Sequence, residues 1–114
     1  MAMRRGLATA ALLAAFAARG GCLDDIRRNG VLIAGNGIMG DKPSLWQEQD
    51  GAYHGLDWDI LQQLSTRLGV PKNRFVITEW TSLIPGLKAR RWDLILSDME
   101  VTQERIVKAH MRFS

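Results

Sequence analysis

The sequence predicts an α/β domain built on a parallel β-sheet. Apolar runs recur at Val31–Ala34, Arg74–Trp80 and Asp93–Leu96, the first two rich in β-branched residues, and apolar residues at helical spacing lie between them. The segments that join these runs are long enough for right-handed crossover connections, which parallel strands require. Open parallel sheets collect binding groups at the carboxyl ends of their strands, so the loops after the three runs are where a ligand site is expected.

The first predicted strand is Val31–Ala34, which a short polar segment at residues 24–29 precedes. Its unbroken apolar character favours burial on both faces. Residues 35–43 contain three glycines and one proline, which oppose helix and strand. No helical pattern follows them directly, so they are not a dinucleotide-binding fingerprint. Asp50 and Gly51 then predict the turn of a hairpin within residues 45–53.

Two helices are predicted between the strands. The first has Asp57 as its expected N-cap, Asp59 near the positive end of its dipole, and a stop at residues 69–71. Its apolar positions are at helical spacing: Ile60, Leu61, Leu64 and Leu68. The second helix follows the strand Arg74–Trp80, is capped by Thr81 or Ser82, and has Pro85 within its first turn, where a missing backbone donor costs little.

The third strand, Asp93–Leu96, runs into polar residues. Thr102 begins a short helical stretch that ends at about Ala109, and Met111–Ser114 is expected to start a fourth strand.

The N-terminus has the layout of a secretory signal peptide. Residues 1–5 are short and positive, residues 6–18 are small and apolar, and residues 15–17 offer a small-x-small cleavage pattern. The signal is assigned to residues 1–21, as a lipoprotein signal that ends before Cys22 or with cleavage after Ala17. Cys22, the single cysteine, is either lipidated or an idle thiol. Residues 22–114 are therefore expected outside the cytoplasm, in the periplasm or tethered to a membrane by a lipid.

The charge balance argues against nucleic acid as a partner. Three of the 15 basic residues precede Cys22, which leaves 12 basic against 12 acidic residues in the expected mature chain. Neither a metal-ligand spacing nor a nucleophile motif is present, and His54 and His110 lie far apart in sequence. No cofactor is expected.

Four motifs together resemble a known family. They are G-L-D-W-D at 55–59, W-T-S-L-I-P-G-L at 80–87, W-D-L-I at 92–95 and V-T-Q-E-R at 101–105, followed by F-S at 113–114. Their order and spacing resemble the N-terminal lobe of family 3 solute-binding proteins, the receptors of amino-acid ABC importers. The resemblance covers the chain from about Leu23 to its last residue.

This resemblance implies a type II periplasmic-binding-protein fold. The chain would hold the N-terminal part of lobe 1 without the second lobe, as a fragment whose sheet has an exposed edge. The whole receptor would be a monomer that delivers a small ligand to the membrane subunits of an ABC transporter, and no catalysis is expected of it.

The resemblance also assigns ligand-binding roles. Arg105 would grip the ligand carboxylate through its planar guanidinium, Trp80 would stack on the ligand, and Ser97 would meet the ligand amino group. Taken singly, these residues fit ordinary structural roles: a solvated helix residue, a core tryptophan and a strand cap.

Three acidic residues depart from the family pattern. Asp98 and Glu100 stand where small or hydroxyl residues are frequent, and Asp41 lies near the usual place of a clamp aromatic. Negative charge around a ligand disfavours acidic amino acids and favours a basic amino acid or another cation. The alternative is that Asp98 and Glu100 point into solvent.

Two other functions use the same fold. One is a periplasmic dehydratase of the cyclohexadienyl or arogenate type, with Glu100 or Asp98 as general acid. The other is the sensory ligand-binding domain of a membrane receptor.

Overall fold

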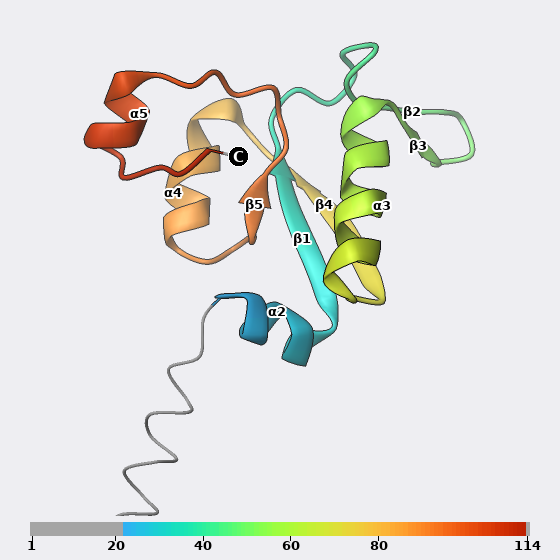
Figure 1. Cartoon of the computed structure of the whole chain (residues 1–114). Helices are drawn as coiled ribbons and strands as arrows, with labels where there is room; N and C mark the ends of the chain where they lie inside the picture. The colour runs from blue at the N-terminus through green and yellow to red at the C-terminus, as the bar shows by residue number, and fades with distance from the viewer. Residues whose placement is uncertain (1–21, 114) are drawn as a thin grey trace, which may run out of the picture.

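Strand β1 (Val31–Asn36) is the centre of a three-stranded parallel sheet in the computed structural model, which describes residues 22–113 (Figure 1). β4 (Lys72–Ile77) pairs with β1 along its whole length, so that Asn36 lies opposite Ile77. β5 (Leu94–Ile95) pairs with the other side of β1, at Ala34 and Gly35. The predicted α/β class and parallel sheet are confirmed, and β5 has one neighbouring strand among the described residues, which leaves it at an edge. The predicted signal peptide lies outside the described residues.

The strand boundaries differ from the prediction. β4 begins two residues before Arg74 and ends at Ile77, and Trp80 starts a short 3-10 helix, η1 (Trp80–Ser82). Asp93 and Leu96 flank β5 instead of belonging to it. The predicted fourth strand is wrong for residues 111–113, which form neither strand nor helix.

Helix α3 (Leu56–Leu68) covers one face of the sheet. Leu61 is fully buried, and it belongs to the same core cluster as Leu32, Ala34 and Phe75. Gly69 ends the helix in the left-handed conformation, as its position predicted. The predicted N-cap is wrong, because Gly55 holds that position and Asp57 lies buried inside the first turn.

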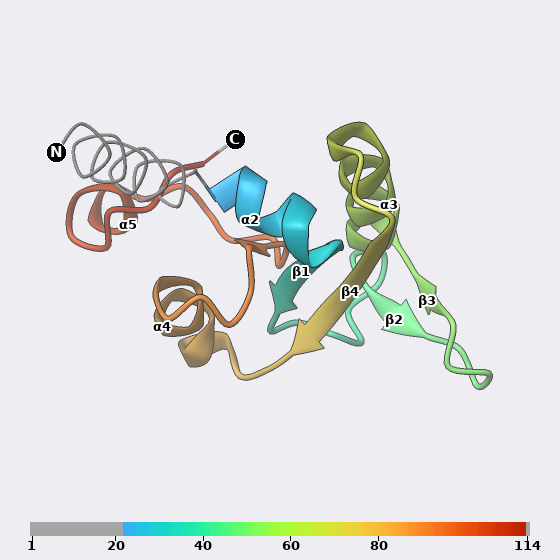
Figure 2. The ribbon, with the colours of Figure 1, turned by 90° about the horizontal axis from the view of Figure 1, so that it is seen from below.

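Helix α4 (Leu83–Lys88) covers the opposite face, as the turned view shows (Figure 2). Ser82 holds the N-cap position, but its hydroxyl makes no capping hydrogen bond, while Pro85 lies in the first turn as predicted. Trp92 is buried beneath α4 and donates its indole N–H to the Leu83 carbonyl at 3.0 Å. A Cβ at Gly86 would lie 2.0 Å from the Trp92 ring, so only glycine fits there.

The predicted hairpin is confirmed as β2 (Trp46–Gln47) and β3 (Tyr53–His54), with Gly51 at positive φ in its turn. Leu45, just before β2, is fully buried and anchors the hairpin to the core.

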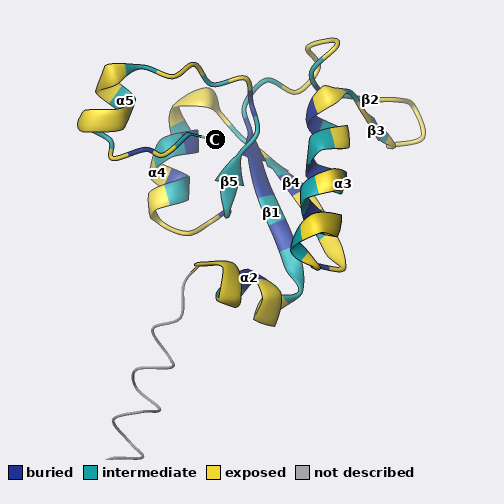
Figure 3. Ribbon diagram, viewed as in Figure 1, coloured by how far each residue is buried: buried dark blue, intermediate teal, exposed yellow. Residues whose placement is uncertain are grey.

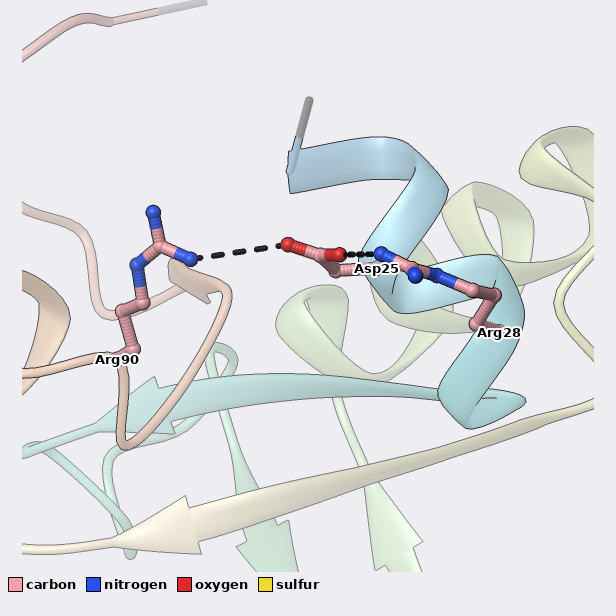
Figure 4. Close-up of polar contacts among 3 residues, drawn as sticks. All are labelled: Asp25, Arg28 and Arg90. Carbon is pink, nitrogen blue, oxygen red and sulfur yellow. Dashed lines mark hydrogen bonds and ion pairs between the residues drawn. The ribbon is translucent and has the colours of Figure 1, made fainter. Parts of the chain in front are cut away.

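The polar segment before β1 is a helix, α2 (Cys22–Asn29), at the N-terminal end of β1. Its buried residue is Ile26, while Cys22 is exposed. Asp25 pairs with Arg28 on the same helix and, at 3.7 Å, with Arg90 in the turn before β5 (Figure 4). Within residues 22–113, none of the helices has the length and apolar character that crossing a membrane requires.

Candidate functional site

Three loops meet at the carboxyl ends of the strands, where the sheet geometry predicts a ligand site. They are the glycine loop (residues 37–45) after β1, η1 after β4, and the segment 97–105 after β5 (Figure 1). We call this region the carboxyl edge. Burial is high along β1 up to this edge, whereas the loops beyond it are largely exposed (Figure 3).

Asn36 joins three segments at the carboxyl edge. Its carboxamide is fully buried, and its Nδ2 donates to the Leu96 carbonyl at 2.7 Å and to Asp57 Oδ2 at 3.2 Å. Its Oδ1 accepts from the Ile38 amide at 2.8 Å. The side chain therefore connects the end of β5, the start of α3 and the glycine loop.

Ser97 makes a second connection between the loops. Its hydroxyl, in a residue only 2% exposed, accepts from the Gly37 amide at 2.9 Å. The hydroxyl thus has the strand-capping role that the sequence offered beside the ligand role. A Cβ at Gly37 would lie 2.9 Å from the Trp80 Cα, so glycine is what lets the loop and η1 approach each other.

Arg105 lies against Trp80. Its guanidinium carbon is 5.9 Å from the Trp80 ring centroid, which is cation–π distance, and its Nη1 donates to the Glu100 carbonyl at 2.7 Å. Arg105 belongs to α5 (Gln103–Val107), whose N-cap Thr102 accepts from the Arg105 amide at 3.2 Å. This helix start is where the sequence predicted it. Trp80 remains 39% exposed, so part of its surface is open to another group.

The three acidic candidates have different surroundings. Asp98 is at positive φ, and its carboxylate accepts from the Ser44 hydroxyl in the glycine loop. Glu100 is exposed, and its backbone carbonyl is the group that holds Arg105. Asp41 is exposed in the glycine loop, where its carbonyl accepts from the amides of Ser44 and Leu45.

Asp57 has a perturbed carboxyl group beneath these loops. Burial first and the negative charge of Asp98 second raise its pKa from 3.8 to about 6, against the lowering effect of the hydrogen bond from Asn36. Sequence reasoning missed Asn36 and Asp57 as parts of the site. The available signal for Asn36 was its position, since it is a polar residue at the end of a buried strand.

The other chemistry-bearing residues do not form a centre. His54 stacks on Trp46 in the hairpin, and His110 follows α5. Among residues 22–113, no three side chains of His, Cys, Asp or Glu converge as a metal site requires. Cys22 is exposed on α2, and its lipidation stays a prediction.

Two curated proteins and one solved structure illustrate what the chain is similar to. It is 30% identical to the "Probable amino-acid ABC transporter periplasmic-binding protein y4tE" of Sinorhizobium fredii, over 75% of this chain and 29% of that protein. It is 34% identical to the "Cyclohexadienyl dehydratase" of Pseudomonas aeruginosa, over 93% of this chain and 40% of that protein. The chain therefore spans less than half the length of these relatives.

The solved structure that is similar to this chain is the arginine-bound form of domain 1 from TmArgBP, the ArgBP of T. maritima. It superposes with a TM-score of 0.65 at 31% identity, over 71% of this chain and 63% of that one. The fold is thus that of a single lobe of a binding protein. Residues 36–114 match the bacterial extracellular solute-binding proteins, family 3, and the chain belongs to that family.

Proposed function

We propose that the chain is the ligand-gripping lobe of an extracytoplasmic receptor that delivers a basic amino acid, or a related cationic amine, to an ABC importer. The observation that carries the proposal is Arg105 lying on the exposed Trp80 at the carboxyl edge. A planar guanidinium on an aromatic support is suited to hold a ligand carboxylate by two parallel hydrogen bonds.

The contacts of Arg105 leave it capable of this role. One of its N–H groups donates to the Glu100 carbonyl, and within residues 22–113 its other guanidinium donors have no hydrogen-bond partner, which leaves them for a ligand. Trp80 supports the guanidinium on its ring and offers its remaining exposed surface to the ligand. The Ser97 hydroxyl accepts from the Gly37 amide and so fixes the glycine loop, which lies beside Trp80.

Negative charge at the same edge supports a cationic ligand. Asp98 and Glu100 belong to the segment that carries Arg105, and Asp41 belongs to the facing glycine loop. These carboxylates attract a cationic group and repel a second carboxylate on the ligand. The arginine-bound form of domain 1 from TmArgBP supports the same ligand class, and it shows that one lobe of a relative holds its ligand.

Isothermal titration calorimetry of the chain with arginine, lysine, glutamate and aspartate tests the proposal. We expect arginine or lysine to bind best. Arg105→Lys keeps the positive charge but removes the planar guanidinium and its two parallel hydrogen bonds to a carboxylate. The substitution should therefore weaken the binding of arginine or lysine at least about tenfold. Arg67→Lys, on the exposed part of α3, is the matched control and should bind as the wild type does. Tightest binding of glutamate or aspartate would contradict the cationic ligand, and unchanged binding by Arg105→Lys would contradict the role of Arg105.

A dehydratase is the second candidate, favoured by the 34% identity to the cyclohexadienyl dehydratase. A general acid works best with a pKa near the working pH, and Asp57, with a pKa of about 6, meets that condition better than an ordinary carboxyl. Asp98 and Glu100 remain the more accessible carboxyl groups at this edge. Turnover of prephenate or arogenate by the chain would establish this function, and binding of these compounds without turnover would oppose it.

A further inference from the structure

A ring of hydrogen bonds lies beneath the proposed ligand site. On one side, Asn36 donates to the Asp57 carboxylate, and the Asp57 amide donates to the Ser44 carbonyl at 2.9 Å. The Ser44 hydroxyl then donates to the Asp98 carboxylate. On the other side, Asp98 is the sequence neighbour of Ser97, whose hydroxyl accepts from the Gly37 amide. Gly37 follows Asn36 in sequence, which closes the ring. The ring ties β1, the glycine loop, α3 and the segment after β5 to one another.

The ring contains two carboxylates, Asp57 and Asp98, and Asp57 is only 2% exposed. Asp98 is the charged group that faces Asp57 from the segment after β5, and Asn36 and Ser44 are the polar groups from β1 and the glycine loop. Arg112, from the C-terminal segment, lines the same hollow of about 450 Å³ as Asp57. Asp59 is the other charge in the first turn of α3, and it is exposed.

We propose that Asn36 and Asp57 are positioning residues of the ligand site, and that protonation of Asp57 weakens the binding of a cationic ligand. This rests on the proposed function for the identity of the ligand. Ionised Asp57 accepts a charge-assisted hydrogen bond from Asn36, which orients the carboxamide toward Leu96 and Ile38. It also adds negative charge to the edge that already carries Asp98.

Protonation removes both effects at once. The hydrogen bond to Asn36 becomes a neutral one, about half as strong, and the carboxyl edge becomes less negative. The coupling is reciprocal, so a bound cation also makes Asp57 harder to protonate. The change falls around the pKa of Asp57, which burial and Asp98 hold near 6.

Calorimetry with arginine as the probe tests the pH dependence. In the wild type the affinity should fall about threefold to tenfold between about pH 7.5 and about pH 5, since one charge is lost near the ligand. Asp57→Asn keeps an oxygen that accepts from Asn36 but has no charge to lose, so its affinity should stay near the low-pH value throughout. The variant retains every other ionisable side chain of the wild type, and the difference between the two profiles therefore isolates Asp57. Parallel profiles would overturn the proposal.

A second measurement does not depend on the ligand, so a failure of the proposed function is distinguishable from a failure of this inference. Amide chemical shifts of Gly37 and Ile38 and the Asn36 side-chain NH₂ shifts should titrate with a midpoint near the pKa of Asp57 in the wild type. In Asp57→Asn these shifts should stay constant over that window. If arginine does not bind but the shifts titrate, the receptor proposal fails and the positioning role stands. If the shifts do not titrate in the wild type, the positioning role is overturned whatever binds.

Discussion

The two ends of the parallel sheet use polar side chains in opposite ways. At the N-terminal end of β1, Asp25 pairs with Arg28 and Arg90, whose side chains are 63% and 82% exposed. At the carboxyl end, Asn36 is fully buried and Ser97 is 2% exposed, and both make hydrogen bonds to backbone groups from other segments. Water competes with the first set of contacts and is excluded from the second. Similar polar chemistry therefore holds a short helix at one end and joins the loops of the proposed ligand site at the other.

The energies of the two sets should differ accordingly. An exposed ion pair stabilises a protein by about 0.2 to 1 kcal/mol at most sites, because solvent screens it and long side chains lose entropy. Removing one partner from a buried hydrogen bond leaves the other group unsatisfied, at about 1 to 3 kcal/mol for each group. Substitutions at both ends test this contrast directly.

The largest effect is expected at Asn36. Asn36→Ala leaves the Leu96 carbonyl and the Ile38 amide without their side-chain partner and removes the Asp57 partner as well. The free energy of unfolding should fall by about 2 to 4 kcal/mol, measured by urea unfolding monitored by tryptophan fluorescence. Asn73→Ala is the matched control, since the half-buried Asn73 carboxamide exchanges two hydrogen bonds with the Gln62 side chain. Equal losses in the two variants would show that burial is not what separates them.

An intermediate effect, with a defined pH dependence, is expected at Asp57. Its pKa of about 6 in the fold exceeds the ordinary 3.8, so the folded state binds the proton more tightly than the unfolded chain. Protonation therefore stabilises the fold as the pH falls through about 6 toward 4, by at most about 3 kcal/mol. Asp57→Asn lacks this titration, so it should exceed the wild type in stability by about 1 to 3 kcal/mol above pH 7, and the difference should shrink toward pH 4.

Urea unfolding of both proteins across this pH range measures that difference, and Asp59→Asn, an exposed carboxyl on the same turn, is the control. If the difference in the free energy of unfolding between the wild type and Asp57→Asn widened on acidification, the pKa of Asp57 would be lowered in the fold.

The smallest effect is expected at the opposite end of the sheet. Arg90→Ala removes the 3.7 Å pair with Asp25 and should change the free energy of unfolding by less than about 0.5 kcal/mol. This small change in the free energy of unfolding should disappear at high salt, because salt screens an exposed ion pair. A loss of more than about 1.5 kcal/mol, insensitive to salt, would remove the proposed contrast between the two ends.

Local patterns were sufficient to predict most of the fold. An unbroken apolar run, the Asp50-Gly51 turn and helical spacing predicted β1, the hairpin and α3, because each of these signals lies within a short stretch of sequence. α2 was missed because its apolar anchor is the single buried residue Ile26 in a polar segment. Asp57 was predicted as an N-cap on local grounds. It lies instead inside the first turn of α3, where it accepts a hydrogen bond from Asn36, 21 residues away.

The site was less predictable than the fold. Arg105 and Trp80 were given ligand-binding roles only through the family resemblance, and their contact with each other was not predicted. The ring through Asn36 and Asp57 joins residues up to 60 positions apart, as in the bond from Gly37 to Ser97. Such contacts form because the parallel strands bring distant loops together, and no short pattern around either residue specifies its partner.

The bond from Arg105 to the Glu100 carbonyl has a consequence for the entropy of binding. A long, flexible arginine normally loses about 1.5 to 2 kcal/mol of rotamer freedom when a ligand immobilises it. Here the carbonyl on one side and the Trp80 ring on the other already restrict the side chain. Most of that loss is therefore incurred when the lobe folds, and under the proposed function a ligand carboxylate would meet a guanidinium that is already preorganised.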